Sequence, residues 1–267
     1  DGRLCPRGLG GLGAIYDPDR LQTPLLRTGT RGRESFRRTS WSDALNHAAA
    51  ELDKVRKRHG PDSIAGLIHG FSDTHVEHFL KALGTPNIAT PSYAECRGPR
   101  DAGWILTYGH EFFSPETSDM ANARFIALLG YHLGENMHST QVRDFAQGLR
   151  NGAKLLVADP RFSTAAAKAD WYLPLRPGTD LALLLAWIHV VIREGLYDAA
   201  CVAAHATGFD QLRQAVESNT PAWAAEITEI PAGVIEETAR AMGAAKPAVC
   251  IHPGRHAAWY GDDVQRS

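Results

Sequence analysis

Short apolar runs alternate with amphipathic segments along most of the chain. The runs 124–129, 154–158 and 171–175 have the length and apolar content of buried strands. Longer segments with a helical spacing of apolar residues lie among them, at 140–149 and 181–192. Such alternation is typical of a parallel, doubly wound sheet with helices on both faces, so the pattern predicts an α/β fold.

The pattern continues toward both ends of the chain. Ser40 or Ser42 can cap a helix whose apolar residues recur from Ala44 to Val55 and which ends before Gly60–Pro61. Residues 1–39 are rich in Gly, Pro and Arg with little periodicity, which predicts an irregular segment dominated by loops. The other expected elements are strands at 63–69 and 248–252 and helices at 74–83 and 231–242.

Polar residues follow two of the expected strands where they end. The run 154–158 stops at Asp159, and the run 171–175 is followed by a turn that leads to Asp180, at the start of the next helix. In open α/β sheets, ligands bind outside the carboxyl ends of the strands, where an Asp can accept ribose hydroxyls. The two strand ends therefore predict a nucleotide-type site.

Composition narrows the class of protein. The 267 residues are 44% hydrophobic and carry a formal net charge of −2, which allows a sizeable core in one or two domains and implies no nucleic-acid partner. The apolar run 181–192 is too short to span a membrane, so we expect any membrane attachment to come through a partner. The start at Asp1 and the stop at Ser267 are interpreted as the ends of a fragment, so the absence of a targeting signal is uninformative.

Four cysteines, at positions 5, 96, 201 and 250, show no paired spacing that would indicate a disulfide framework or a zinc site. Cys201 and Cys250 lie in apolar surroundings and are expected to be buried thiols. Gly8–Gly13 formally contains the G-x-G-x-x-G pattern, but that motif needs a strand before it, and Cys5–Pro6 precedes it here. A nicotinamide-dependent dehydrogenase is therefore disfavoured.

A series of short motifs extends over nearly all of the chain: Leu4–Gly8, Asp17–Leu21, Ser40–Leu45, Leu129–Gly130 with Gly134–Asn136, Asp159–Arg161, Leu173–Asp180 and His252–Arg255. In these motifs, in their order and in their spacing, the chain resembles the molybdopterin oxidoreductases of the dimethyl sulfoxide reductase superfamily. The segments Gly134–His138 and Trp259–Asp263 look closest to the thiosulfate, polysulfide and sulfite-oxidising branch.

The resemblance implies two Rossmann-like αβα units and the edge of an N-terminal iron-sulfur domain. Residues 1–39 would end the 4Fe-4S domain. Residues 40–95 and 245–267 would form the first, discontinuous α/β domain, and residues 96–244 the second, which binds the guanylyl molybdopterin.

The same resemblance implies two metal ligands. Cys5 matches the last of four thiolates that hold a 4Fe-4S cluster, with an ordinary loop cysteine as the alternative. Arg7 matches a basic residue between cluster and pterin, or is a solvent-facing arginine. Cys96 falls where the family supplies the protein ligand to molybdenum, and its alternative is a buried loop cysteine. Arg97 and Arg100 would stabilise an oxyanion substrate or form structural salt bridges.

The remaining implied contacts are with the cofactor's nucleotide and pterin ends. Asp159 would accept ribose hydroxyls and Asp180 the N–H groups of guanine, and Asp180 could also cap a helix, a role that can coexist with guanine binding. The other candidate residues are Gly130, Glu135, Asn136, Arg161, Ser163 and Gly178. Of the histidines, His252 lies in a segment that approaches the cofactor in the family.

The implied function is that of the catalytic subunit of a molybdenum bis(guanylyl molybdopterin) oxidoreductase in anaerobic respiration. It would carry out two-electron redox chemistry on a small, sulfur-containing substrate and exchange electrons through the 4Fe-4S cluster. An iron-sulfur electron-transfer subunit and a membrane-anchor subunit are the expected partners, which would place the protein at the periphery of a bacterial membrane, on its periplasmic or cytoplasmic face. The alternative is a non-catalytic relative that serves as a scaffold or electron-transfer subunit of a respiratory complex.

Overall fold

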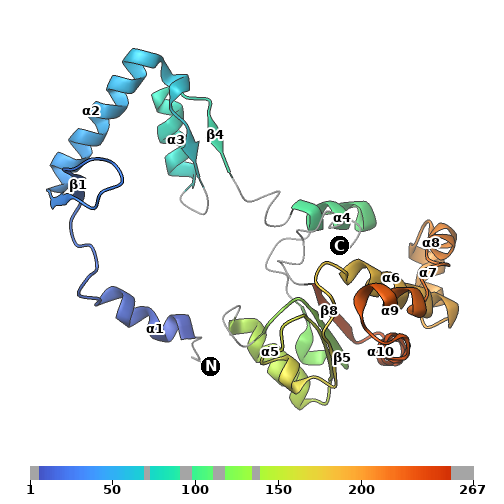
Figure 1. Ribbon diagram of the computed structural model, residues 1–267. Coiled ribbons are helices and arrows are strands. Elements are labelled where there is room, and N and C mark those ends of the chain that lie inside the picture. Colours follow the sequence, from blue (N-terminus) through green and yellow to red (C-terminus); the bar gives the residue numbers. More distant parts are fainter. Residues whose placement is uncertain (1–5, 69–72, 91–97, 111–117, 134–138, 254–267) are drawn as a thin grey trace. The chain divides into compact units, whose positions relative to one another are not determined.

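The computed structural model describes residues 6–68, 73–90, 98–110, 118–133 and 139–253, without the side chains of Pro6, Arg7, Ser139 and Thr140. The chain divides into two compact units, one of residues Leu9–Glu95 and one of Asp1–Gly8 with Cys96–Ser267. Each unit is described separately, and the ribbon is drawn in Figure 1.

The smaller unit combines helices with two very short sheets. Ser40, one of the two candidate caps in the sequence, caps α2 by accepting a hydrogen bond from the backbone N–H of Asp43, and Gly60 ends the helix with a φ of 83°. A small core of Ile64, Ile68 and Leu80 lies where β3 and β4 pair in parallel. The elements of this part are α1 (Pro6–Ile15), β1 (Leu25–Arg27), β2 (Phe36–Arg38), α2 (Trp41–His59), β3 (Gly66–Leu67), α3 (Asp73–Leu83) and β4 (Ile88–Ala89).

The larger unit is built on a four-stranded parallel sheet with the order β7-β6-β5-β8. Its strands are β5 (Phe125–Leu129), β6 (Lys154–Ala158), β7 (Trp171–Leu173) and β8 (Val249–Pro253). Its helices are α4 (Gly98–Tyr108), α5 (Ser139–Arg150), α6 (Asp180–Arg193), α7 (Ala199–His205), α8 (Phe209–Ala215), α9 (Pro221–Thr228) and α10 (Ala232–Ala245). The α/β prediction is confirmed.

Both faces of this sheet are covered by helices, as Figure 1 shows. Side chains alternate between the faces along each strand, so the apolar runs of β5 and β6 serve two cores. One core joins Phe125, Ala127, Leu129, Leu156 and Ala158 to α6, α9 and α10. The other joins Ile126, Leu128, Leu155 and Val157 to Phe145 of α5.

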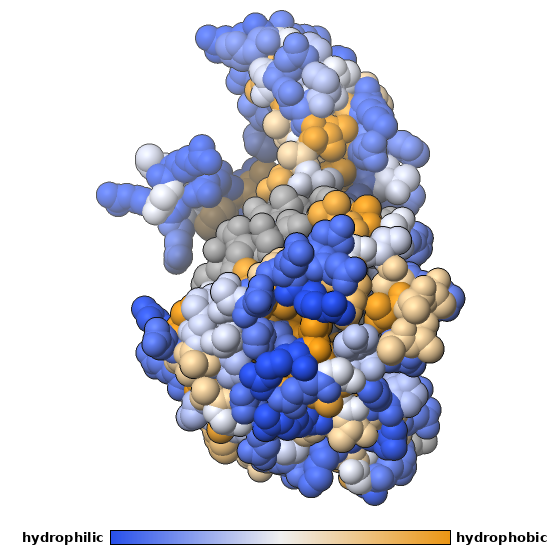
Figure 2. Space-filling model, turned by 90° about the vertical axis from the view of Figure 1, so that its right-hand side faces the viewer, coloured by the Kyte–Doolittle hydropathy of each residue, from blue (hydrophilic) through white to orange (hydrophobic). Residues whose placement is uncertain are grey.

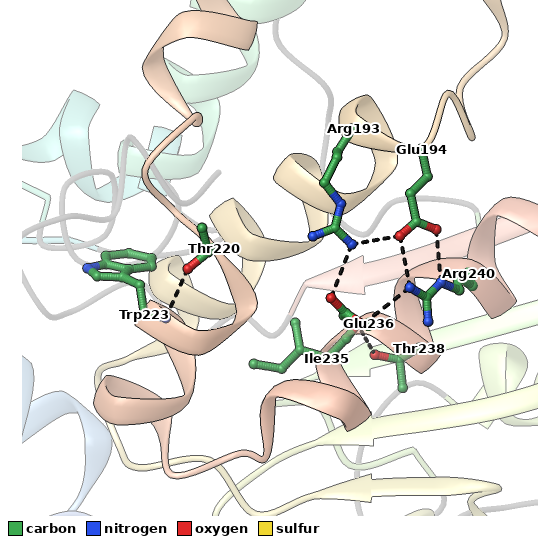
Figure 3. A network of polar contacts seen from close by, with 8 residues as sticks. All are labelled: Arg193, Glu194, Thr220, Trp223, Ile235, Glu236, Thr238 and Arg240. Atoms are coloured by element: carbon green, nitrogen blue, oxygen red, sulfur yellow. Dashed lines mark hydrogen bonds and ion pairs between the residues drawn. The ribbon is translucent and has the colours of Figure 1, made fainter.

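Polar contacts tie α6 to α10 on the outside of the first core (Figure 3). Glu194, which follows α6, accepts two hydrogen bonds from Arg240 of α10 at 2.8 and 2.9 Å. Arg193 contacts both Glu194 and Glu236, at 2.6 and 3.1 Å. The hydrogen bonds from Arg240, followed by those from Arg193, lower the pKa of Glu194 to about 2. Nearby in the core, the indole N–H of Trp187 donates to Thr238 Oγ1 at 2.9 Å.

The surface on the side of α7 and α8 is coloured mainly as hydrophilic in Figure 2, with smaller apolar areas between. Within the described ranges, no helix is both long enough and apolar enough to cross a membrane.

Three sequence predictions differ from the structure. Strand β8 pairs with β5 along its whole length, so it belongs to the larger unit, whereas residues 245–267 were expected to join residues 40–95. Residues 6–15, which were expected to be irregular, form α1, and Leu9, Leu12 and Ile15 on this helix are exposed. Cys201, expected to be buried, is exposed on α7, and Cys250 is partly buried. The division into domains otherwise stays a prediction.

Candidate functional site

The four parallel strands end at the same edge of the sheet. Leu129 pairs with Ala158 and with Pro253, and Ala158 pairs with Leu173, so these carboxyl ends lie side by side. The segments that follow the strands therefore all begin along this edge of the sheet. This edge is where ligands bind in open α/β sheets.

Asp159 begins the turn after β6 and is buried. Its backbone N–H donates to Leu173 O at 3.1 Å, and its carboxylate accepts from the backbone N–H of Arg161 at 2.8 Å. The second bond is an Asx turn, which fixes the direction of the carboxylate. An ionised carboxylate has about four acceptor positions, so the turn leaves acceptor capacity for a ligand.

The negative charge of Asp159 contributes to the raised pKa of the neighbouring Tyr172. The pKa of Tyr172 is raised, first by burial of its hydroxyl and second by the negative charge of Asp159. The Phe162 ring stands edge-on to Tyr172, with 5.1 Å between the ring centroids, and is 64% exposed. The phenol therefore stays neutral beside the carboxylate.

A second carboxylate stands at the start of α6. Gly178 has a φ of 81°, a left-handed conformation that a glycine adopts without strain, and the chain then reaches Thr179 and Asp180. Thr179 occupies the N-cap position without a side-chain capping bond, and Asp180 is the first residue of the helix. The prediction that Asp180 could be the cap is therefore wrong. A carboxylate in the first turn still gains from the positive end of the helix dipole.

Gly130 turns the chain after β5 with a φ of 58°. Its own N–H donates to Ala158 O at 2.8 Å, so this amide is engaged within the sheet rather than directed at a ligand. Gly130 was a candidate cofactor contact in the sequence. In the structure, Gly130 is a turn residue. Glu135 and Asn136 lie outside the described residues.

Two further candidates differ in their surroundings. Ser163 is buried, and its hydroxyl accepts from the backbone N–H of Ala166 at 3.2 Å, where it supports the 3-10 turn Ala166–Lys168. Arg161 is exposed at the same turn. Ser163 thus has a structural role in the turn, while Arg161 faces solvent beside Asp159.

Arg100 is buried on α4, two residues after the start of the helix. Its guanidinium lies 3.5 Å from Asp101 and 5.2 Å from the centroid of the Trp104 ring. This geometry matches the structural salt bridge, one of the two roles that the sequence left open. Cys5, Cys96 and Arg97 lie outside the described residues, as does the side chain of Arg7.

The sequence did not reveal a stacked pair at the same sheet edge. Tyr131, just after β5, and His252, near the end of β8, are both buried with 4.0 Å between ring centroids and 13° between ring planes. The Tyr131 hydroxyl donates to Gln141 of α5 at 2.8 Å. His252 stood out in the sequence, but no periodicity or spacing pointed to Tyr131 or Gln141.

Comparison with known proteins identifies the family. A model of the molybdopterin oxidoreductases, described as "Molybdopterin oxidoreductase", matches residues 20–266. The chain belongs to the molybdopterin oxidoreductase family. Molybdopterin is thus the cofactor of the family to which this chain belongs.

Similar proteins carry different activities in their names. The thiosulfate reductase molybdopterin-containing subunit PhsA of Salmonella typhimurium is 35% identical over 98% of this chain and 34% of its own length. Formate dehydrogenase H of Escherichia coli is 33% identical over 94% of this chain and 36% of its own length. The solved structure of acetylene hydratase from Pelobacter acetylenicus matches with a TM-score of 0.76 and 30% identity over 96% of this chain and 35% of that one. The chain thus spans about a third of the length of these relatives.

The described residues suit the nucleotide end of such a cofactor. Asp159 and Asp180 place two carboxylates after neighbouring strands, and carboxylates accept from ribose hydroxyls and from guanine N–H groups. Within the same described ranges, no group of three or more His, Cys, Asp or Glu side chains is placed to hold a metal ion.

Proposed function

We propose that this chain is the nucleotide-binding part of the catalytic subunit of a molybdenum oxidoreductase. The observation that carries the proposal is a pair of carboxylates in a member of this family: Asp159 directly follows β6, and Asp180 begins α6, the helix that follows the neighbouring strand β7. When bound, the cofactor supplies two-electron redox chemistry, and the protein binds and orients it.

The proposed cofactor is the bis(guanylyl molybdopterin) form. The Asp159 carboxylate, held by its Asx turn, accepts ribose hydroxyls, and Asp180 accepts from the amino and ring N–H of guanine. The left-handed turn at Gly178 brings Asp180 to the positive end of α6, where negative phosphate groups are also favoured. Gly178 therefore has a conformational role, and Arg161 is an exposed candidate for a phosphate.

The metal ligands are proposals on family position. Cys96 is proposed as the protein ligand to molybdenum and Cys5 as a ligand of a 4Fe-4S cluster whose other thiolates come from elsewhere. Arg7 is proposed between cluster and pterin, and Arg97, beside Cys96, as a contact for an oxyanion. Arg100 is assigned to supporting α4, because its charge lies against Asp101 and Trp104.

The proposed substrate is a small sulfur-containing molecule, because the thiosulfate reductase subunit aligns with 98% of this chain at 35% identity. Electrons would pass singly through the cluster to an iron-sulfur partner subunit, and a membrane-anchor subunit would hold the complex at the membrane. A relative named as a hydratase shares the fold, so the family alone does not decide the reaction.

The test of this proposal is the guanylate content of the complete protein. Asp180→Ala should reduce the guanine nucleotide released on acid hydrolysis at least tenfold relative to the wild-type protein, while the fold is retained. Asp198 offers a matched control, because its carboxylate accepts from the N–H of Cys201 at the start of α7, beyond the other end of α6. Asp198→Ala should cost about 1 kcal/mol of stability and leave the guanylate content unchanged. Unchanged guanylate in Asp180→Ala would contradict the assignment.

Metal analysis separates the proposal from the scaffold alternative. An oxidoreductase of this kind should contain molybdenum and iron after anaerobic purification of the complete protein, together with a pterin. A non-catalytic relative would contain no molybdenum. Iron near zero after anaerobic reconstitution would remove the cluster from the proposal without touching the nucleotide site.

A further inference from the structure

The stacked pair Tyr131 and His252 joins three elements on one face of the sheet. His252 pairs in register with Leu128 of β5, and both point to the face covered by α5. The His252 ring nevertheless stacks on Tyr131, three residues beyond Leu128, so it reaches toward the carboxyl edge of the sheet. The Tyr131 hydroxyl in turn bonds Gln141 of α5.

The bond between Tyr131 and Gln141 closes the segment that joins β5 to α5. These two residues lie near the two ends of that segment, and their side chains meet at 2.8 Å. His252 holds the Tyr131 ring from the neighbouring strand, and its Nδ1 lies 3.1 Å from Pro253 O, the last residue of β8. His252 therefore contacts residues at the exits of both β5 and β8.

Burial makes this arrangement selective. Tyr131 is 5% and His252 is 6% exposed, so both rings are out of solvent. A buried phenol is costly unless its hydroxyl is bonded, so the bond to Gln141 favours one geometry of Tyr131 over others. Parallel aromatic rings at this separation also resist sliding, because they lose contact area when they move.

We propose that His252, Tyr131 and Gln141 form a positioning brace for the cofactor. The brace sets the position of the chain as it leaves β5 and β8, and so raises the affinity for a pterin cofactor bound at the sheet edge. None of the three residues needs to touch the cofactor. The inference rests on the proposed function, because it assumes that the cofactor binds at this edge.

The experiment measures how fast the complete holoprotein loses its cofactor. Wild type and variants are diluted under anaerobic conditions, and the molybdenum and the fluorescent oxidised pterin that remain are measured over time. Thermal unfolding of each sample is followed by circular dichroism. A brace should change cofactor retention beyond what any change in the unfolding temperature explains.

Two substitutions separate the ring contact from the polar bond. His252→Ala removes the stack and should release the cofactor at least tenfold faster. His252→Phe keeps a flat ring against Tyr131 and should restore most of the retention. Tyr131→Phe keeps the stack and loses the bond to Gln141, and the loss of one hydrogen bond should speed release about fivefold.

A matched control comes from another aromatic pair of the same unit. Tyr197 and Phe209 lie with 4.8 Å between ring centroids in the α6–α8 region, away from the carboxyl ends of the strands. Phe209→Ala should leave the release rate unchanged. Its thermal unfolding shows what the loss of an aromatic contact does by itself.

The outcomes decide the inference. Wild-type release from His252→Ala, with only a lower unfolding temperature, would show that the stack is core packing and overturn the brace. If His252→Phe did not restore cofactor retention, the contact between the two rings would not be the basis of the brace. A wild-type protein without pterin would overturn the proposed function and this inference together, whereas pterin in the wild type and in His252→Ala at equal retention overturns this inference alone.

Discussion

The two units of this chain differ in how far the described residues bury their apolar pattern. In the larger unit, the runs at β5 and β6 are enclosed, with Leu155 and Leu156 at 0% exposure. In the smaller unit, α2 has no buried residue, and Trp41 and Leu45 are 67% and 62% exposed. The apolar pattern therefore predicted both the strands and the helix correctly, but it did not predict that the apolar side chains of α2 would be exposed.

The two units differ less in their polar interactions than in their apolar burial. The larger unit has ion pairs between elements distant in sequence, since Arg240 and Glu194 join α10 to the end of α6. In α2 of the smaller unit, Asp53 pairs with Lys57 and Arg56 within a single helix. Contacts between elements stabilise the tertiary structure, whereas contacts within a helix stabilise mainly that helix.

The prediction with the largest expected effect tests the difference in apolar burial between the two units. Leu156→Ala, in the centre of the sheet, should lower the free energy of unfolding by about 2–5 kcal/mol, because it leaves a cavity between β6 and the helices. Leu45→Ala on α2 should change it by less than about 0.5 kcal/mol. Urea unfolding of both variants tests this. Equal effects would mean that the exposed face of α2 is enclosed in solution.

The next prediction compares the contribution of buried hydrogen bonds in the two units. Thr238→Val in the larger unit removes the acceptor of the Trp187 indole N–H and should cost about 1–3 kcal/mol. Thr85→Val in the smaller unit removes the acceptor of the Asn87 N–H and the donor to Ile64 O, and should cost a similar amount.

Chemical denaturation of the two threonine variants provides the measurement. Similar losses would show that the units differ in apolar burial and not in their buried hydrogen bonds. A loss in Thr238→Val without one in Thr85→Val would extend the difference to polar contacts.

The smallest effect concerns acid. Hydrogen bonds from Arg240 and then Arg193 lower the pKa of Glu194 from 4.5 to about 2. A lowered carboxyl pKa stabilises the folded state above the ordinary value, and this stabilisation is lost as pH falls from 4.5 toward 2. Glu194→Gln should therefore reduce the acid dependence of the unfolding midpoint over that window.

Asp53 is the matched comparison in the smaller unit. Hydrogen bonds from Lys57 and then Arg56 also lower its pKa. Because these partners lie on the same exposed helix, Asp53→Asn should alter the acid dependence less than Glu194→Gln. Both effects should shrink in high salt, since the pairs are exposed to solvent. A larger effect from Asp53→Asn would reverse the ranking.

Much of the site could be predicted from local pattern. The strand at 154–158 was predicted with the bounds of β6, and the helix at 181–192 differs from α6 by one residue at each end. A buried parallel strand is a continuous apolar run, so its end is visible where the first acid appears. The sequence thus located Asp159 directly after β6 and Asp180 at the start of α6. Their contact with a nucleotide stays a prediction.

Other features were missed because their cause is not local. No helix was predicted over α4, which begins at Gly98–Pro99, although proline is well tolerated in the first turn of a helix. Cys201 lies in an apolar run, yet α7 exposes it, because burial depends on what a helix packs against.

By itself, the sequence determined the α/β class, the principal strands and helices of the larger unit, the acids at its strand ends and the family. These follow from hydrophobic period, turn residues and motif order, which act over a few residues. The tertiary structure alone decided that β8 lies beside β5, that Arg100 is buried against Trp104, and that Tyr131 stacks on His252. Those contacts join residues distant in the chain or depend on how a whole helix packs, so no local pattern encodes them.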